Sequence, residues 1–119
     1  MVRAGQWGEA EVARLLESWG LEIWGRNVRL GPLELDIVAL EGPVVVVVEV
    51  RTRRVSGLVS PFASLTPKKR LRFRRAGERL WARYFRMNPR VERLRYDVAA
   101  VYTEGAQHSI EYHRGFFTG

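Results

Sequence analysis

The stretch LELDIVALEGPVVVVVEVR, residues 33–51, decides the fold of this chain. It predicts two β-strands joined by a turn at residues 41–43. Residues 44–48 are five consecutive valines, which are β-branched and too few to span a membrane. This run therefore predicts a strand that is buried on both faces of a sheet.

Acidic residues stand at the ends of these two strands. Glu34 and Asp36 precede the turn, and Glu49 follows it, two residues before Arg51. Because side chains alternate along a strand, Glu34 and Asp36 share one face, and Glu49 and Arg51 share one face. The acids are candidate metal ligands. The alternative is that they are ordinary solvated strand ends.

The hairpin register decides between these interpretations. If Leu40 pairs with Pro43 across a two-residue turn, Asp36 lies opposite Val47 and Glu49 is its diagonal neighbour, at roughly 7–8 Å. Two carboxylates at that separation can share one divalent cation. A three-residue turn would put them on opposite faces unless a bulge intervened. The sequence leaves both registers open.

Composition limits the class of protein. With 119 residues we expect a single domain, residues 1–119, with one core. The absence of cysteine excludes a disulfide framework and a thiolate metal site. The sequence has no stretch of signal-peptide or membrane-spanning hydrophobicity, so we expect a cytoplasmic protein without a membrane partner.

Charge is divided unevenly along the chain. Lys and Arg total 20 against 13 Asp and Glu, yet residues 51–95 carry 15 basic and 2 acidic side chains. Such asymmetry points to a polyanionic partner, of which nucleic acid is the commonest. Of the basic residues 18 are arginine, which suits phosphate recognition and is also typical of a GC-rich or thermophilic source.

Residues 6–19 predict an amphipathic helix that ends at Gly20. Glu9 falls on its apolar stripe with Val12 and Leu16, where a carboxylate needs a partner. Glu9 is either a first-turn acid favoured by the helix dipole or a member of the same acidic pocket as Asp36.

A second helix is predicted from the N-cap Thr66 and Pro67 to about Met87, before Asn88-Pro89. Its apolar stripe comprises Phe73, Ala76, Gly77, Leu80, Trp81 and Tyr84, which we interpret as core and not as a base-stacking platform. Its other faces carry basic side chains, which include Lys68, Lys69, Arg72, Arg75, Arg79, Arg83 and Arg86. With Glu78 as the one acid on this helix, the basic face predicts phosphate contact, although a charged outer face is often only solvated.

The remaining segments complete the topology. Residues 21–30 and 94–102 predict strands, residues 110–112 a short last strand, and residues 51–65 a basic loop that is a candidate flap over a substrate. The third strand, the second helix and the fourth strand form a crossover unit, which implies a parallel pair in a mixed sheet flanked by helices.

This α-β-β-β-α-β-β order, with an aspartate on the second strand and a Glu-x-(basic) pair on the third, resembles the restriction-endonuclease-like PD-(D/E)XK fold, an α/β three-layer core with a mixed β-sheet. The likeness sharpens to the uncharacterised bacterial YraN-like proteins, whose pattern runs along nearly the whole chain. It shows as Gly8-Glu9, Asn27-Val28-Arg29, ELDIVA at 34–39, VEVRTR at 48–53, Gly57, Pro61, Pro67-Lys68-Lys69 and RYDVAAV at 95–101. That family is related in fold to Holliday-junction resolvases.

The resemblance implies catalytic roles for Asp36, Glu49, Arg51 and Glu9. Asp36 and Glu49 with the Val50 carbonyl would bind magnesium or manganese, with Glu9 and Glu34 completing the acidic cluster. Arg51 stands where the motif has lysine. An arginine can hold a phosphate oxygen but cannot deprotonate to act as a base.

The sequence thus predicts a metal-dependent endonuclease acting on DNA, including branched or damaged structures. Its backbone contacts would come from Arg53, Arg54, Lys68, Lys69, Arg72, Arg75, Arg79 and Arg83. One alternative is a non-catalytic nucleic-acid-binding module that lost its chemistry at Arg51. Another is a scaffold whose basic surface meets an acidic protein, RNA or ribosomal partner. Many proteins of this fold act as homodimers, but the sequence identifies no interface.

Overall fold

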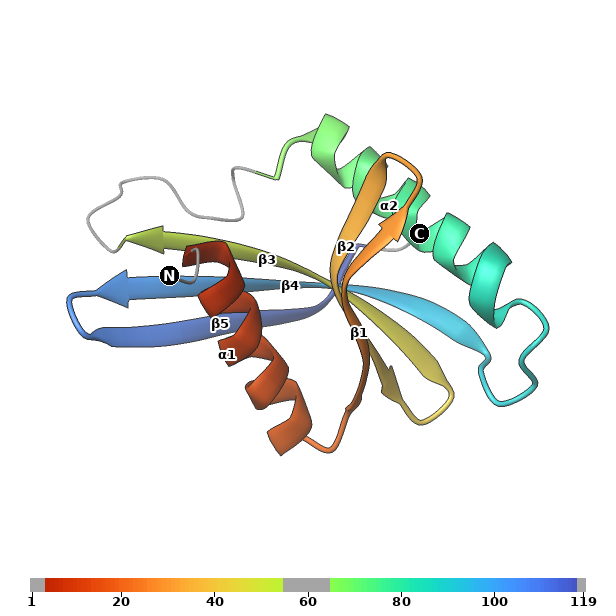
Figure 1. The fold of residues 1–119 in the computed structure, drawn as a ribbon, viewed down its shortest axis with the longest axis horizontal. Helices are drawn as coiled ribbons and strands as arrows, with labels where there is room; N and C mark the ends of the chain where they lie inside the picture. Colours follow the sequence, from red (N-terminus) through yellow and green to blue (C-terminus); the bar gives the residue numbers. More distant parts are fainter. Residues whose placement is uncertain (1–3, 55–64, 118–119) are drawn as a thin grey trace.

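The computed structural model describes residues 4–54 and 65–117. Two long helices and five strands follow one another in the predicted order (Figure 1). The elements are α1 (Ala4–Ser18), β1 (Glu22–Leu30), β2 (Leu33–Glu41), β3 (Val44–Arg54), α2 (Pro67–Leu80), the π-helical turn η2 (Trp81–Phe85), β4 (Arg93–Glu104) and β5 (Gln107–Phe117).

The five strands form one mixed sheet in the order β1-β2-β3-β4-β5. All neighbouring pairs are antiparallel except β3 and β4, which are parallel and are connected through α2. Helix α1 packs on one face of the sheet and α2 on the other, which gives three layers (Figure 1). The predicted restriction-endonuclease-like α/β architecture is therefore confirmed.

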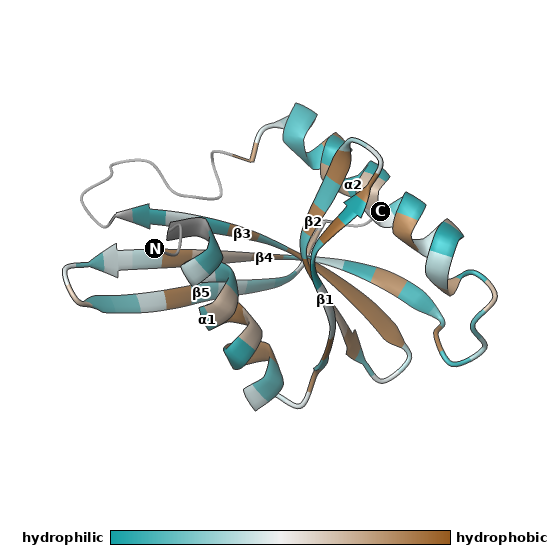
Figure 2. Ribbon diagram, viewed as in Figure 1, coloured by the Kyte–Doolittle hydropathy of each residue, from teal (hydrophilic) through white to brown (hydrophobic). Residues whose placement is uncertain are grey.

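The valine run lies at the centre of this arrangement. Val45 and Val47 belong to the core on the α2 side, and Val44, Val46 and Val48 belong to the core on the α1 side. All five are buried, as predicted for a strand with both faces covered. In Figure 2 the hydrophobic colour concentrates in the strands, while α2 carries mostly hydrophilic positions on its outside.

Local signals end α1 and begin α2 where the sequence indicated. Gly20 has a φ of 89°. Its N–H bonds to the Glu17 carbonyl and the Leu21 N–H to the Leu16 carbonyl, the Schellman pattern that ends α1. The Thr66 hydroxyl accepts a hydrogen bond from the Lys69 N–H and caps α2.

The pairing of Leu40 with Pro43, one of the registers that the sequence left open, does not occur. Leu40 pairs with Val45, and the closing pair of the β2–β3 hairpin is Glu41 with Val44. The turn therefore consists of Gly42 and Pro43, with a φ of 57° at the glycine. A positive φ at the first central residue is one that glycine adopts without strain, and Pro43 supplies the negative φ that follows.

The C-terminal end of the second helix also differs from prediction. The Arg86 N–H bonds to the Trp81 carbonyl, which is the i→i+5 pattern of a π-turn. The extra residue in this turn rotates the helix face by one position. Phe85 is consequently buried, whereas Tyr84, predicted as core, is 43% exposed.

Two strands are longer than the sequence indicated. Strand β3 continues through Arg54, so residues 51–54 pair with β4 and are not loop. Strand β5 spans eleven residues and pairs along most of β4. Residues 55–64 of the predicted flap, including Gly57 and Pro61, lie outside the described residues. Among the described helices, none is long and apolar enough to cross a membrane.

Candidate functional site

The candidate site lies where β2 separates from β3. The ladder between these strands ends at the pair Ile37–Val48. One step further in the same register, Asp36 stands opposite Glu49. The Val50 N–H donates a hydrogen bond of 2.8 Å to Asp36 Oδ2. This bond fixes the Asp36 carboxylate across the opening between the two strands, beside Glu49.

A distortion of the β1–β2 hairpin brings Asp36 to this position. Leu35 packs in the core on the α2 side and Ile37 in the core on the α1 side, although regular alternation would place both on one face. Asn27, which stands opposite Asp36 between two paired positions of β1, has a φ of 52°. Among residues 4–54 and 65–117 it is the only non-glycine residue with a positive φ. The hairpin therefore changes faces at Asn27 and Asp36.

Helix α1 contributes Glu9 from the opposite side of the opening. Its side chain is largely buried, and its Oε2 atom has no hydrogen-bond partner. Among the described residues the nearest cation is Arg26, whose Nη2 lies 3.9 Å from that oxygen. Gly8 lets the helix approach this closely, because a Cβ atom there would stand 2.5 Å from Thr52 Oγ1 on β3.

Burial raises the pKa of all three carboxylates, and the Asp36 charge raises those of Glu9 and Glu49 further. Burial raises the pKa of Glu9 to about 7, and the nearby Asp36 charge adds to that effect. The pKa of Glu49 rises to about 8 through burial and then through the Asp36 charge, while the Arg51 guanidinium opposes the shift. The pKa of Asp36 is raised chiefly by burial, and its bond from Val50 opposes the rise. Asp36 lies within hydrogen-bonding reach of both glutamates, so it is the centre of this carboxylate cluster.

The chemistry of the carboxylate cluster fits a hard divalent cation. Carboxylate oxygens are the ligands that magnesium and manganese prefer, and a cation would neutralise the Asp36 charge that adds to the effect of burial on the pKa values of Glu9 and Glu49. The unpartnered Oε2 of Glu9 is a further oxygen available to such an ion. As they stand, however, no three His, Cys, Asp or Glu side chains in the described parts of the chain are arranged to hold a metal together. The predicted ligands are thus neighbours whose oxygens do not yet converge on one point.

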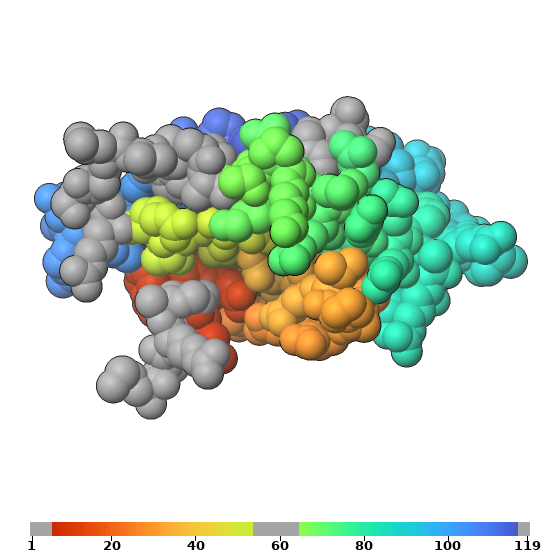
Figure 3. All heavy atoms as spheres, turned by 90° about the horizontal axis from the view of Figure 1, so that it is seen from above, coloured from red at the N-terminus to blue at the C-terminus, as the bar shows by residue number. Residues whose placement is uncertain are grey.

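A pocket of about 470 Å³ opens beside the carboxylate cluster on the α2 side. Glu49 and Arg51 of β3 line it together with Lys69 and Arg72 of α2. Arg51 Nη1 lies 3.6 Å from Glu49 Oε1, and both side chains are mostly buried. Figure 3 shows the end of β3, the first turns of α2, the β1–β2 hairpin and α1 meeting on this side of the molecule. The α2-side pocket therefore places three cationic side chains next to the acids.

Glu34, the fourth predicted metal ligand, lines the outer part of the same pocket. Its carboxylate pairs with Arg29, at 3.1 Å from Nη1 to Oε2. It lies near enough to Asp36 to contribute to the rise of that pKa. Glu34 is therefore adjacent to the carboxylate cluster but already has a cationic partner.

The other predicted basic residues spread over the exposed side of α2. Lys68, Arg75 and Arg83 are exposed. Arg79 is exposed as well, and its Nη1 donates a hydrogen bond of 3.2 Å to the Leu30 carbonyl, which ties α2 to the β1–β2 turn. Arg53 extends from β3 as an exposed side chain, and the Arg54 side chain lies outside the described residues.

A further acid of the sheet, Asp97 on β4, is fully buried. Arg95 donates to both of its oxygens, at 2.9 and 3.0 Å, and the Gly115 N–H donates at 2.8 Å. The Tyr112 hydroxyl donates to it as well. Since every oxygen has partners, this network joins β4 to β5 and offers no open ligand position.

Arg26 is the functional candidate that sequence reasoning did not name. Its distance from Glu9 depends on how α1 packs against β1, which no local pattern specifies. Asn27, part of the family pattern at residues 27–29, lies opposite Asp36 on β1. Its side chain lies close enough to Glu9 to lower the pKa of that carboxyl, so Asn27 supports the carboxylate cluster.

Comparison with known proteins places this arrangement in a family. The model of the family described as "Uncharacterised protein family UPF0102" matches residues 8–101. The chain belongs to the UPF0102 family. The predicted resemblance to YraN-like proteins is thereby confirmed, and the matched region of the UPF0102 chain contains Glu9, Asp36, Glu49 and Arg51.

Individual UPF0102 relatives are similar over most of the chain. A protein of Sorangium cellulosum is 46% identical over 97 residues, which cover 82% of this chain and 67% of that protein. One from Nitratidesulfovibrio vulgaris is 43% identical over 108 residues, 91% of this chain and 78% of the relative. One from Moorella thermoacetica is 42% identical over 103 residues, 86% of this chain and 82% of the relative.

Proposed function

We propose that this UPF0102 chain is a cytoplasmic, metal-dependent endonuclease that hydrolyses phosphodiester bonds in DNA. The observation that carries the proposal is the placement of Asp36 and Glu49 side by side, with Glu9 completing the carboxylate cluster and Arg51 beside it. Asp36, Glu49 and Glu9 would hold magnesium or manganese. When bound, the ion supplies an activated water and neutralises charge at the scissile phosphate.

Arg51 contributes charge and not proton transfer. Its guanidinium stays protonated, so it cannot take a proton from an attacking water. It can hold a phosphate oxygen through two N–H groups and stabilise negative charge as that charge develops. Its present pairing with Glu49 holds the guanidinium at the edge of the carboxylate cluster.

Lys69 and Arg72 extend the cationic surface from Arg51 along α2. Both line the α2-side pocket, and Lys68, Arg75 and Arg83 continue the charge over the exposed helix. Contacts of this kind bind the phosphate backbone without reading bases. Binding should therefore depend little on sequence and weaken steeply with added salt.

The test is cleavage of labelled duplex, single-stranded and four-way-junction DNA with magnesium, manganese or EDTA. The wild type should cut with metal and not with EDTA. Asp36→Ala should lose cleavage while it retains or tightens DNA binding, because a negative charge is removed from the phosphate path. A wild type that binds DNA and cuts none of these substrates with either metal would contradict the proposed hydrolysis.

Arg51 favours a second candidate function, a nucleic-acid-binding module without catalysis, because an arginine cannot act as a base. On this alternative the carboxylate cluster has only a structural role, and binding resides in the basic face of α2. Arg51→Lys then becomes the informative variant, because it restores a side chain that can change protonation. Metal-dependent cleavage by Arg51→Lys and not by the wild type would support this candidate.

A further inference from the structure

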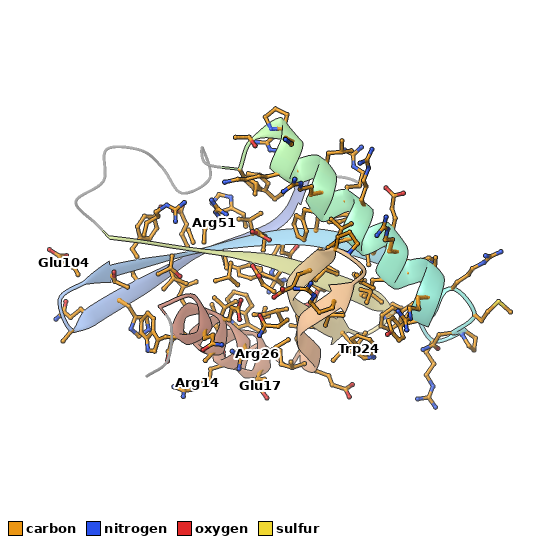
Figure 4. The ribbon with its side chains drawn as sticks, turned by 45° about the horizontal axis from the view of Figure 1, so that its top comes forward. Arg14, Glu17, Trp24, Arg26, Arg51 and Glu104 are labelled. Atoms are coloured by element: carbon orange, nitrogen blue, oxygen red, sulfur yellow. The ribbon has the colours of Figure 1, made fainter. Side chains whose placement is uncertain are left out.

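A second pocket, of about 550 Å³, lies on the α1 side of the carboxylate cluster. It is lined by Gln6, Trp7, Ala10, Arg14, Arg26 and Asn27, none of which lines the pocket next to α2. Arg26 connects it to the cluster through its 3.9 Å approach to Glu9. In Figure 4 the labelled Arg51 lies on one side of β3, and Arg26 and Arg14 lie near α1 on the other side. The carboxylates therefore stand between two cationic pockets.

The α1-side pocket combines positive charge with an aromatic wall. The Arg26 guanidinium is held by the Gln6 carbonyl at 3.3 Å, and its side chain remains 37% exposed. The Trp7 ring is only partly buried and lies edge-on to His108, with 4.9 Å between the ring centroids. A fixed guanidinium next to a fixed indole is a combination that binds a phosphate and a nucleobase together.

We propose that this α1-side pocket binds one unpaired nucleotide of the substrate strand, next to the scissile phosphate. The inference rests on the proposed nuclease function. A strand held by Arg51, Lys69 and Arg72 passes the carboxylate cluster and reaches Arg26, so the bond to be cut has nucleotides on both sides. A base that contacts Trp7 must leave its stack. The substrate class is therefore nucleic acid with an unpaired nucleotide beside the cut.

The first experiment measures binding without cleavage. Affinity for a fluorescent ten-nucleotide single strand and for a blunt duplex of the same sequence is compared in EDTA. Trp7→Leu removes the aromatic face and keeps an apolar side chain against the core, while Trp7→Phe keeps an aromatic ring. We expect Trp7→Leu to weaken single-strand binding about tenfold, the change that corresponds to losing one base–aromatic stack. Trp7→Phe should lose much less, and duplex binding should change little in both.

The second experiment tests the charge of the pocket. Arg26→Gln should weaken single-strand binding and reduce the slope of log affinity against log salt by about 1, as expected for one lost phosphate contact. Arg90→Ala is the matched control, because Arg90 is exposed in the turn that follows η2, near the start of β4 and away from Glu49. It removes the same charge and should leave single-strand affinity and slope close to those of the wild type.

Thermal unfolding identifies variants that fail to fold, and Arg26→Gln then provides a readout independent of Trp7. Folded variants that bind the single strand like the wild type, with an unchanged salt slope, would overturn the subsite even if the wild type cleaves DNA with metal. If the variants lose binding as expected but the wild type cleaves no DNA, the subsite stands and the proposed hydrolysis is contradicted. A wild type that binds neither oligonucleotide overturns both.

Discussion

Asp36 Oδ2 accepts a hydrogen bond of 2.8 Å from the Val50 N–H, which joins β2 to β3 just beyond the last pair of their ladder. The bond replaces the next ladder bond at the point where β2 turns away. It also keeps the carboxylate beside Glu49, although burial and the charge of Glu34 disfavour its ionised form. Asp36 thus joins β2 to β3 at this point and also adds its charge next to Glu49.

Asp36→Asn should therefore separate stability from metal binding. The amide oxygen can still accept the Val50 hydrogen bond, while the repulsion with Glu9 and Glu49 disappears. We expect a higher Tm than the wild type without metal, by about 4 °C for each kcal/mol gained at this chain length. Differential scanning calorimetry in EDTA measures it.

Manganese should raise the Tm of the wild type and leave that of Asp36→Asn unchanged, because binding to the folded state stabilises it only where a site exists. Glu17→Gln on the exposed side of α1 removes a carboxylate at a distance and provides the control. If the variant still gains as much Tm with manganese as the wild type, Asp36 is not a ligand.

Stability should fall with rising pH because of the same carboxylate cluster. Folding raises the pKa of Glu9 from 4.5 to about 7 and that of Glu49 from 4.5 to about 8. Between the unfolded and the folded pKa of each glutamate, the folded state binds more protons than the unfolded chain. The stabilising contribution is complete below pH 4.5 and is lost as the pH rises through 7 and 8. The Tm in EDTA should therefore decrease from pH 5 to pH 8.5.

The double variant Glu9→Gln, Glu49→Gln should flatten this decrease, because neither position then titrates. Metal binding reverses the trend in the wild type, since a cation displaces the shared protons and binds better when they have left. The increase in Tm caused by manganese should be larger at pH 8 than at pH 5.5. Equal slopes of Tm against pH in the wild type and the double variant would show that other groups control the dependence.

The sequence predicted the layers of this fold because its strongest signals are local. The valine run requires a central strand, and Thr66-Pro67 begins a helix long enough to cross from β3 to the parallel β4. The register of the β2–β3 hairpin was not predictable, because pairing of Leu40 with Pro43 and pairing of Glu41 with Val44 both suit the same apolar pattern.

The acids of the candidate site were predictable, and their mutual placement was not. Glu9 stood out as an acid on an apolar stripe, and the structure puts it next to Asp36. The approach of Arg26 to Glu9, the positive φ of Asn27 and the extra residue at the π-turn depend on tertiary packing. The sequence has no periodic pattern that specifies which residues one side chain contacts across a sheet.

Gly8 should be required for the position of Glu9. An alanine Cβ at this position would stand 2.5 Å from Thr52 Oγ1, while the next nearest atoms are at 3.7 Å. Gly8→Ala should therefore destabilise the protein by about 1–3 kcal/mol, the usual cost of overpacking. Because the clash is with one oxygen, adding Thr52→Ala should restore most of the loss. Chemical denaturation of the two single variants and the double variant gives the coupling energy. Additive effects would mean that the contact does not limit the approach of α1.

Asn27 should support the site through both its backbone and its side chain, and two substitutions separate these roles. Asn27→Gly keeps a residue that adopts a φ of 52° without strain but removes the amide near Glu9. Asn27→Ala removes the amide and also strains the backbone, at a cost of roughly 1 kcal/mol or more. We expect Asn27→Ala to lower the free energy of unfolding, and Asn27→Gly to lower it much less.

The amide has its own readout in the titration of Glu9. The Asn27 amide lowers the pKa of Glu9, so both variants should raise that pKa further and extend the decrease in Tm to higher pH. The carboxyl resonance of Glu9, followed by NMR from pH 5 to pH 9, measures the shift directly. A shift in Asn27→Ala alone would assign the effect to displacement of the hairpin. The same shift in both variants would assign it to the side chain, which acts on Glu9 across the opening that Asp36 holds from the other strand.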